Sequence, residues 1–142
     1  MAGGYYFAGG DECEGTTKFL EPIIDNGRLT HFNYSGPGNP ICAQYQQEHP
    51  PIQYINGQRT HSDEIALKHD IAYTNALQVK DPAIRQKMIR KADMEYIQEH
   101  ERYPNEPGKL GLAGIRAKVA AEKYIPGAKR LIGDYSGGKK RK

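Results

Sequence analysis

Two long segments with helical periodicity, separated by only two residues, constrain the fold of this chain more than any other feature. The first is expected to run from about residue 62 to 79 and the second from about residue 82 to 103. Because the linker Lys80–Asp81 has room only for a turn, the two helices should pack antiparallel. The sequence therefore predicts a mainly α-helical protein whose core is this helical hairpin.

Both helices carry start signals. Thr60 or Ser62 can cap the first helix, and Asp63 favours the positive end of its dipole. In the second helix Asp81 is a capping residue and Pro82 takes the first helical position. The expected apolar faces consist of Ile65, His69, Ala72, Tyr73, Ala76 and Leu77 on the first helix, and of Ile84, Met88, Ile89, Ala92, Tyr96 and Ile97 on the second.

A histidine and an aspartate fall at the same level of this hairpin. His69 lies eleven residues before Lys80 and Asp93 lies thirteen after it, so a rise of ~1.5 Å per residue places them at nearly the same height. A lone histidine on an apolar face is usually a satisfied core residue. Here burying either group alone would be costly, and we therefore expect His69 and Asp93 to form a hydrogen bond.

The segment Tyr34–Asn39 is the second chemical feature, because Gly36 and Gly38 occupy alternate positions. Such glycines allow unusual backbone angles, and inward-turned carbonyls can supply oxygens to a hard cation such as calcium. A carboxylate is also needed to compensate the charge. Asp70 can supply it, since it points about 100° away from His69 on the helix. Taken alone, the segment more often forms an ordinary Gly-Pro turn.

Together these motifs resemble the signature of phospholipases A2. Tyr-x-Gly-x-Gly at residues 34–38 is followed about thirty residues later by His-Asp-x-x-Tyr at residues 69–73. The resemblance is to the viral type of this family, the domain found in parvovirus minor capsid proteins. It implies a phospholipase A2-like fold, in which the helical hairpin carries the active site and a Gly-rich loop binds calcium.

Three further segments fit the viral type: Gly38-Asn39, Ser62-Asp63 and Ala92-Asp93-x-x-Tyr96-Ile97. The resemblance covers about residues 34–97. The chain differs from the secreted phospholipases A2, because His69 lacks the neighbouring cysteines that form disulfides in those enzymes.

The resemblance implies a calcium-dependent enzyme that hydrolyses the sn-2 ester of membrane phospholipids. The ligands of Ca²⁺ would be the backbone carbonyls of Tyr34, Gly36 and Gly38 together with the carboxylate of Asp70. A phosphate of the lipid can complete the coordination shell, because calcium takes about six to eight oxygens.

The resemblance also assigns the catalytic roles. His69 would take a proton from the attacking water, and Asp93 would orient the imidazole and stabilise the imidazolium. Tyr73 would support Asp93 through its hydroxyl. The amide of Gly36 would stabilise the oxyanion together with calcium.

The same resemblance implies a capsid-associated protein that breaches a host endosomal membrane when a virus enters the cell. Its partners would then be a phospholipid surface and other segments of the capsid protein. The alternative is a non-catalytic capsid or membrane-binding module that keeps the fold. The intact set of His69, Asp70, Tyr73 and Asp93 argues against that alternative.

Composition divides the chain into three parts. Residues 1–30 are Gly-rich and acidic and are expected to form an arm, and the resemblance implies that residues 31–106 form the catalytic core. In residues 107–142 ten Lys and Arg face two acidic residues, which gives a net charge of +8. Within this tail, residues 110–124 predict a basic amphipathic helix that could lie on an anionic membrane. Both termini are expected to be flexible.

The end of the tail suggests a different partner. Its basic run fits a nuclear import receptor, which would add the host nucleus as a location. No specific nucleic acid is predicted, and a solubilising tail without any partner is the remaining alternative. The run consists of Lys139, Lys140, Arg141 and Lys142.

Only two cysteines occur, Cys13 and Cys42, so a small extracellular enzyme stapled by many disulfides is excluded. Two reduced thiols are expected in preference to a single bridge. Residues 1–10 have no basic start and no sustained apolar stretch, so no secretory signal is expected. No run approaches the ~20 apolar residues of a membrane span.

Overall fold

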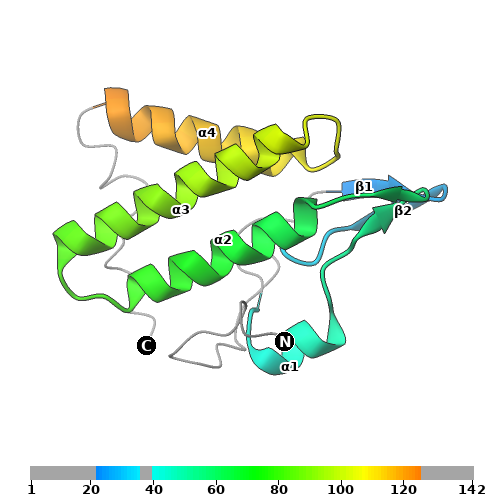
Figure 1. The fold of residues 1–142 in the computed structure, drawn as a ribbon, viewed down its shortest axis with the longest axis horizontal. Helices are drawn as coiled ribbons and strands as arrows, with labels where there is room; N and C mark the ends of the chain where they lie inside the picture. Colours follow the sequence, from blue (N-terminus) through cyan, green and yellow to red (C-terminus); the bar gives the residue numbers. More distant parts are fainter. Residues whose placement is uncertain (1–21, 36–39, 126–142) are drawn as a thin grey trace.

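The computed structural model describes residues 22–35 and 40–125. They form a mainly helical protein with two short antiparallel β-ribbons (Figure 1), so the expected fold class is confirmed at this level. No helix in these two stretches is long and apolar enough to cross a membrane. The elements are β1 (Pro22–Asp25), β2 (Arg28–His31), α1 (Ala43–Glu48), β3 (Tyr54–Ile55), β4 (Gln58–Arg59), α2 (Ser62–Leu77), α3 (Pro82–Arg102) and α4 (Lys109–Tyr124).

Helices α2 and α3 form the expected hairpin and lie side by side (Figure 1). The start of α3 is as predicted, because Asp81 is the N-cap and its carboxylate accepts a hydrogen bond from Ala83 N at 2.9 Å. The start of α2 is as predicted only in part. Its N-cap residue is His61, which makes no capping hydrogen bond with its side chain. The preceding Thr60 accepts a hydrogen bond at Oγ1 from Ser62 N at 3.3 Å, so the predicted capping is confirmed for Thr60 and wrong for Ser62.

The start of α2 is also held by Glu106, which follows α3. Glu106 Oε1 accepts a hydrogen bond from His61 N at 2.7 Å, and Oε2 lies 2.6 Å from His61 Nδ1. The hydroxyls of Thr60 and Ser62 also donate to Glu106 Oε1, at 3.2 and 3.3 Å. Gly108 lies so close that a Cβ there would come within 2.9 Å of Ser62 Oγ. The α3–α4 connection is thus packed onto the start of α2.

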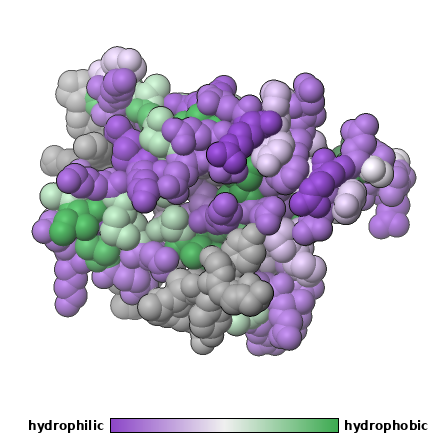
Figure 2. Space-filling model, in the orientation of Figure 1, coloured by the Kyte–Doolittle hydropathy of each residue, from purple (hydrophilic) through white to green (hydrophobic). Residues whose placement is uncertain are grey.

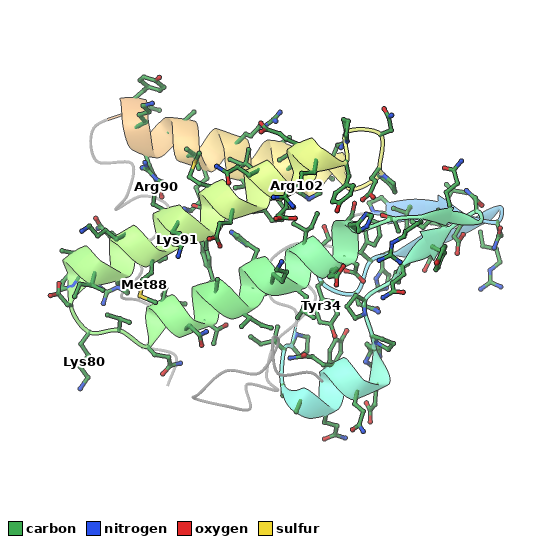
Figure 3. All side chains as sticks on the ribbon, viewed as in Figure 1. Tyr34, Lys80, Met88, Arg90, Lys91 and Arg102 are labelled. Atoms are coloured by element: carbon green, nitrogen blue, oxygen red, sulfur yellow. The ribbon has the colours of Figure 1, made fainter. Side chains whose placement is uncertain are left out.

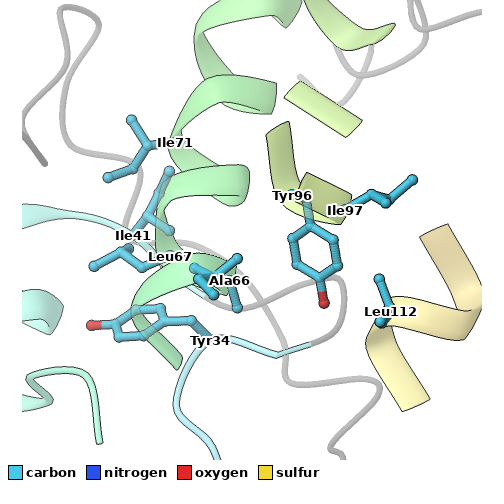
Figure 4. Close-up of a cluster of buried hydrophobic side chains, with 9 residues drawn as sticks. Tyr34, Ile41, Ala66, Leu67, Ile71, Tyr96, Ile97 and Leu112 are labelled. Atoms are coloured by element: carbon cyan, nitrogen blue, oxygen red, sulfur yellow. The ribbon is translucent and has the colours of Figure 1, made fainter. Parts of the chain in front are cut away.

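The main core is built from the hairpin and from segments on either side of it (Figure 4). Most of the predicted apolar residues of α3 are buried, but Ile84 is half exposed and that part of the prediction is wrong. Hydrophilic side chains dominate the face shown in Figure 2. The buried members of this core are Tyr34, Ile41, Ile65, Ala66, Leu67, Ile71, Tyr96, Ile97 and Leu112.

The predicted amphipathic helix of the tail is confirmed as α4, but it belongs to the body of the protein. Leu112 is buried in the main core, and Ile115 and Val119 pack against that core. Part of this apolar face therefore packs against protein, and docking of the tail on a membrane stays a prediction. The expected flexibility of the termini is wrong for residues 109–124, which form this packed helix. The basic run at residues 139–142 lies outside the described residues.

Within the arm expected over residues 1–30, the described residues 22–30 contain β1 and most of β2. Strands β1 and β2 pair across the expected boundary at residue 31, with Ile24 opposite Leu29. Ile23 is buried in a small second cluster with Phe32 and Ile55. Residues 31–60, expected to be a loop, also contain α1, β3 and β4.

The state of Cys42 also differs from the expectation. Cys42 is disulfide-bonded, so the prediction of a reduced thiol is wrong at this position. Its sulfur additionally accepts a hydrogen bond from Tyr45 N at 3.3 Å, which caps α1. Cys13 lies outside the described residues.

The contacts of Glu106 generate a pH-dependent prediction. Burial alone would raise the pKa of Glu106, but hydrogen bonds from His61 outweigh it and hold the pKa below its ordinary value of 4.5. Glu106 therefore stabilises the fold above the unfolded-state pKa, and this contribution is lost as the pH falls through the folded-state pKa. Glu106→Gln should lower the free energy of unfolding by about 1–2 kcal/mol at neutral pH.

Urea unfolding of the wild type and of Glu106→Gln across the pH range measures this difference. It should stay constant down to about pH 5 and shrink below that value. Glu95→Gln is the control, because its side chain is 58% exposed and forms a long ion pair with Lys91; it should change the stability by less than about 0.5 kcal/mol. A Glu106→Gln difference that is independent of pH would contradict the assignment.

Candidate active site

His69 and Asp93 form the expected pair across the hairpin. His69 Nε2 lies 2.8 Å from Asp93 Oδ1, and the Asp93 side chain is completely buried while that of His69 is 10% exposed. A carboxylate can only accept, so the proton of a neutral His69 resides on Nε2 and the lone pair on Nδ1. The hydrogen bond predicted from helical rise is therefore confirmed, and Nδ1 remains as the basic atom.

Lys118 of α4 is the functional neighbour that sequence reasoning missed. Its Nζ donates to Asp93 Oδ2 at 2.7 Å and to Glu122 Oε2 at 2.8 Å. Burial alone would raise the pKa of Asp93, but hydrogen bonds from His69 and Lys118 outweigh it and lower the pKa. A signal was present in the sequence, because Lys118 and Glu122 fall on the same helical stripe as the apolar Ile115.

Tyr73 contacts the site with its ring. The ring centroids of Tyr73 and His69 are 4.6 Å apart, and Lys118 Nζ lies 5.5 Å from the Tyr73 centroid. The Tyr96 ring lies 4.9 Å from the imidazole, so His69 is held between two aromatic rings. The predicted hydrogen bond from the Tyr73 hydroxyl to Asp93 is wrong for this structure, because the described partners of Asp93 are His69 and Lys118.

Asp70 follows His69 on α2 and has a different environment. Its Oδ2 atom is buried and has no hydrogen-bond partner among the described residues. Burial, and then the nearby charge of Asp63, raises the pKa of Asp70 well above its ordinary value. A buried carboxylate without a partner is costly, and a bound cation would compensate it. Asp70 therefore fits the role of a calcium ligand.

Of the three residues expected to bind calcium through their carbonyls, only Tyr34 lies among the described residues. Tyr34 is completely buried, with its ring in the main core, whereas Gly36 and Gly38 lie outside the described residues. Across residues 22–35 and 40–125, no group of three or more His, Cys, Asp or Glu side chains could hold a metal ion. A calcium site at Asp70 would therefore depend on backbone carbonyls, as the sequence motif predicts.

Asp63 attaches the beginning of the glycine segment to α2. Its Oδ1 accepts from Tyr34 N at 2.7 Å, and its Oδ2 accepts from Asn33 N at 3.0 Å and from Ile52 N at 2.9 Å. Asp63 is completely buried, and burial raises its pKa although these three amides act in the opposite direction. Sequence reasoning assigned Asp63 to the helix dipole and to a segment that fits the viral type, and predicted none of these amide contacts.

The arrangement brings Tyr34 and Asp70 to the same side of α2. Asp63 and Asp70 are seven residues apart and so share one face of the helix. The Tyr34 hydroxyl donates to His49 O at 2.6 Å, which fixes the other end of the side chain. Figure 3 shows Tyr34 between α2 and α1. The first expected carbonyl ligand and the expected carboxylate ligand are therefore held on a common surface.

A groove of about 330 Å³ runs between α2 and α3, and His69 lies in its wall. Its lining combines apolar and polar side chains, which suits an amphiphilic ligand. The apolar lining consists of Ile65, Ala72, Ala92 and Tyr96, and the polar lining of Lys68, Glu95, Gln98 and Glu99.

Comparisons with protein-family models, with curated proteins and with solved structures found no match. Any functional assignment of this groove therefore depends on its residues and their geometry.

The three amide contacts of Asp63 generate a stability prediction. In Asp63→Asn one carboxylate oxygen becomes an NH₂ group, which cannot accept, so at least one backbone N–H of residues 33, 34 or 52 loses its partner. The free energy of unfolding should fall by about 2–3 kcal/mol. Urea unfolding at neutral pH measures it.

Asp81→Asn is the matched control, because asparagine caps a helix as well as aspartate does. It should change the free energy of unfolding by less than about 0.5 kcal/mol. Equal effects of the two Asp→Asn substitutions would show that the buried contacts of Asp63 contribute nothing special.

Proposed function

We propose that this protein is a calcium-dependent phospholipase A2 that hydrolyses the sn-2 ester of membrane phospholipids. The observation that carries the proposal is the His69–Asp93 pair in the wall of a groove with mixed apolar and polar lining. The buried Asp70 oxygen, which has no hydrogen-bond partner among the described residues, supports it. The phospholipase A2-like fold, with a calcium loop at residues 34–38, is part of the same proposal.

The proposed reaction begins at Nδ1 of His69, which takes a proton from water as the water oxygen attacks the ester carbonyl. Asp93 stabilises the imidazolium that forms and keeps the ring oriented. The imidazolium then returns the proton to the leaving oxygen of the lysophospholipid, and a fatty acid is released.

The metal-binding part of the proposal uses the carboxylate of Asp70 and the carbonyls of Tyr34, Gly36 and Gly38. Calcium, when bound, supplies positive charge for the oxyanion and for the phosphate of the lipid. The Gly36 amide donates a hydrogen bond to the same oxyanion. Tyr73 belongs to the site through its packing against His69.

The biological setting that we propose is viral. The protein would act on a host endosomal membrane as part of a capsid, and its partners would be the phospholipid surface and other capsid segments. A nuclear import receptor remains a candidate partner of residues 139–142. A non-catalytic membrane-binding module is the rival, and release of fatty acid from liposomes distinguishes the two.

Replacement of His69 generates the first functional prediction. His69→Asn should reduce calcium-dependent release of fatty acid by ~10²-fold or more, because an essential general base contributes at least that much. Circular dichroism and calcium binding should remain those of the wild type. His49→Asn is the control, since the contacts of its ring among the described residues are with the backbone oxygen and the ring of Tyr45. Residual turnover above about a tenth of wild type would exclude His69 as the base.

Replacement of Asp70 should reduce activity by a different route, through weaker calcium binding. Asp70→Asn should weaken calcium binding in calorimetry by about tenfold or more, because the carboxylate charge is lost. In calcium-free buffer the melting temperature should not fall, since the substitution removes a buried carboxylate whose charged form is disfavoured. Asp81→Asn serves as the control on an exposed carboxylate. Unchanged calcium affinity would contradict the ligand assignment.

A further inference from the structure

Lys118 of α4 makes polar and ring contacts with both helices of the hairpin. Its Nζ lies 2.7 Å from Asp93 Oδ2 on α3 and 5.5 Å from the centroid of the Tyr73 ring on α2. The Lys118 side chain is 16% exposed, so the ammonium is largely removed from water. Lys118 therefore lies at the junction of the three long helices. It contacts Oδ2 of the Asp93 carboxylate, whereas His69 contacts Oδ1.

Burial explains why Asp93 needs this partner. The Asp93 carboxylate is completely buried, and a buried charge requires both hydrogen bonds and a compensating charge. A neutral His69 supplies a hydrogen bond and no positive charge. Lys118 supplies the charge throughout, before a proton reaches the imidazole.

A second pair of charges holds Lys118 in place. Glu122 Oε2 accepts from Lys118 Nζ at 2.8 Å, and Arg90 of α3 lies 3.6 Å from the other oxygen of Glu122. The Glu122 side chain is only 3% exposed, and Figure 3 shows Arg90 in the space between α3 and α4. The chain of alternating charges thus runs from α3 to α4 and back to α3.

The torsion of the Asp93 carboxylate also depends on this contact. The terminal torsion of aspartate has a broad minimum, so one hydrogen bond leaves the carboxylate free to rotate. Partners on both oxygens fix its plane. With Lys118 on Oδ2, Oδ1 faces His69 Nε2 and the imidazole is held in one orientation.

We propose that Lys118 is a positioning residue of the His69–Asp93 pair, so that the catalytic unit includes α4. This proposal rests on the proposed function and extends it to a residue outside the phospholipase A2-like motifs. The simpler interpretation is that Lys118 only docks α4 onto α3. In that case its loss would change stability and leave turnover by the folded protein unchanged.

Two substitutions of Lys118 separate these interpretations. Lys118→Met keeps the length of the side chain and removes the charge, whereas Lys118→Arg keeps the charge. With a monomeric short-chain phospholipid and saturating calcium, Lys118→Met should lower kcat by about tenfold or more and leave KM within about twofold. Lys118→Arg should restore kcat to within about threefold of the wild type. Lys123→Met is the matched control, because Lys123 is exposed on the same helix, and should change neither constant.

A spectroscopic measurement tests the positioning without any turnover. The proton on His69 Nε2, hydrogen-bonded to a carboxylate, should give a downfield imidazole N–H resonance in the full chain, identified by its loss in His69→Asn. That resonance should persist in Lys118→Arg and Lys123→Met, and should move upfield or disappear in Lys118→Met. If Lys118→Met does not fold, Lys118→Gln takes its place, because its amide keeps a polar group in the buried site. The same changes are expected for it.

A folded Lys118→Met or Lys118→Gln variant with wild-type kcat and an unchanged resonance would overturn the proposal and leave Lys118 a docking contact. Absence of hydrolysis by the wild type would instead overturn the proposed function. The resonance would still report whether Lys118 positions the pair.

Discussion

The burial of Asp93 is the constraint on which the arrangement of the three long helices depends. A completely buried carboxylate such as that of Asp93 is costly unless both oxygens have partners. One partner, His69, comes from α2 and the other, Lys118, comes from α4. Satisfying this one group therefore requires all three helices to be packed at the same level. The same requirement brings the imidazole to the wall of the groove.

Three buried carboxylate groups on α2 and α3 have three different sets of partners. Asp93 is paired with an imidazole and an ammonium, and Asp63 with three backbone amides. The Oδ2 atom of Asp70 has no partner in the described parts of the chain. These partners suit different roles. A carboxylate that accepts from backbone amides can hold a loop, as Asp63 does, and a carboxylate fixed by a lysine can orient a histidine base, as Asp93 does. A carboxylate oxygen without a partner is suited to bind a cation.

The packing of α4 changes the organisation expected from composition. The positive charge and amphipathic pattern of the tail suggested a helix that faces a membrane. In the structure its apolar side meets the core through Leu112, and Lys118 enters the interior. An amphipathic pattern states only that one face avoids water. It does not state whether lipid or protein covers that face.

The sequence by itself determined the hairpin, the Asp81 cap and the His69–Asp93 pair. Each depends on local periodicity or on helical rise across a two-residue turn, and these distances follow directly from residue numbers. The calcium ligands and the enzymatic activity remain predictions from the motifs. Only the tertiary structure decided the contacts of Asp63, Glu106 and Lys118. Each joins groups that are distant along the chain or belong to different elements, so no local pattern specifies its partner.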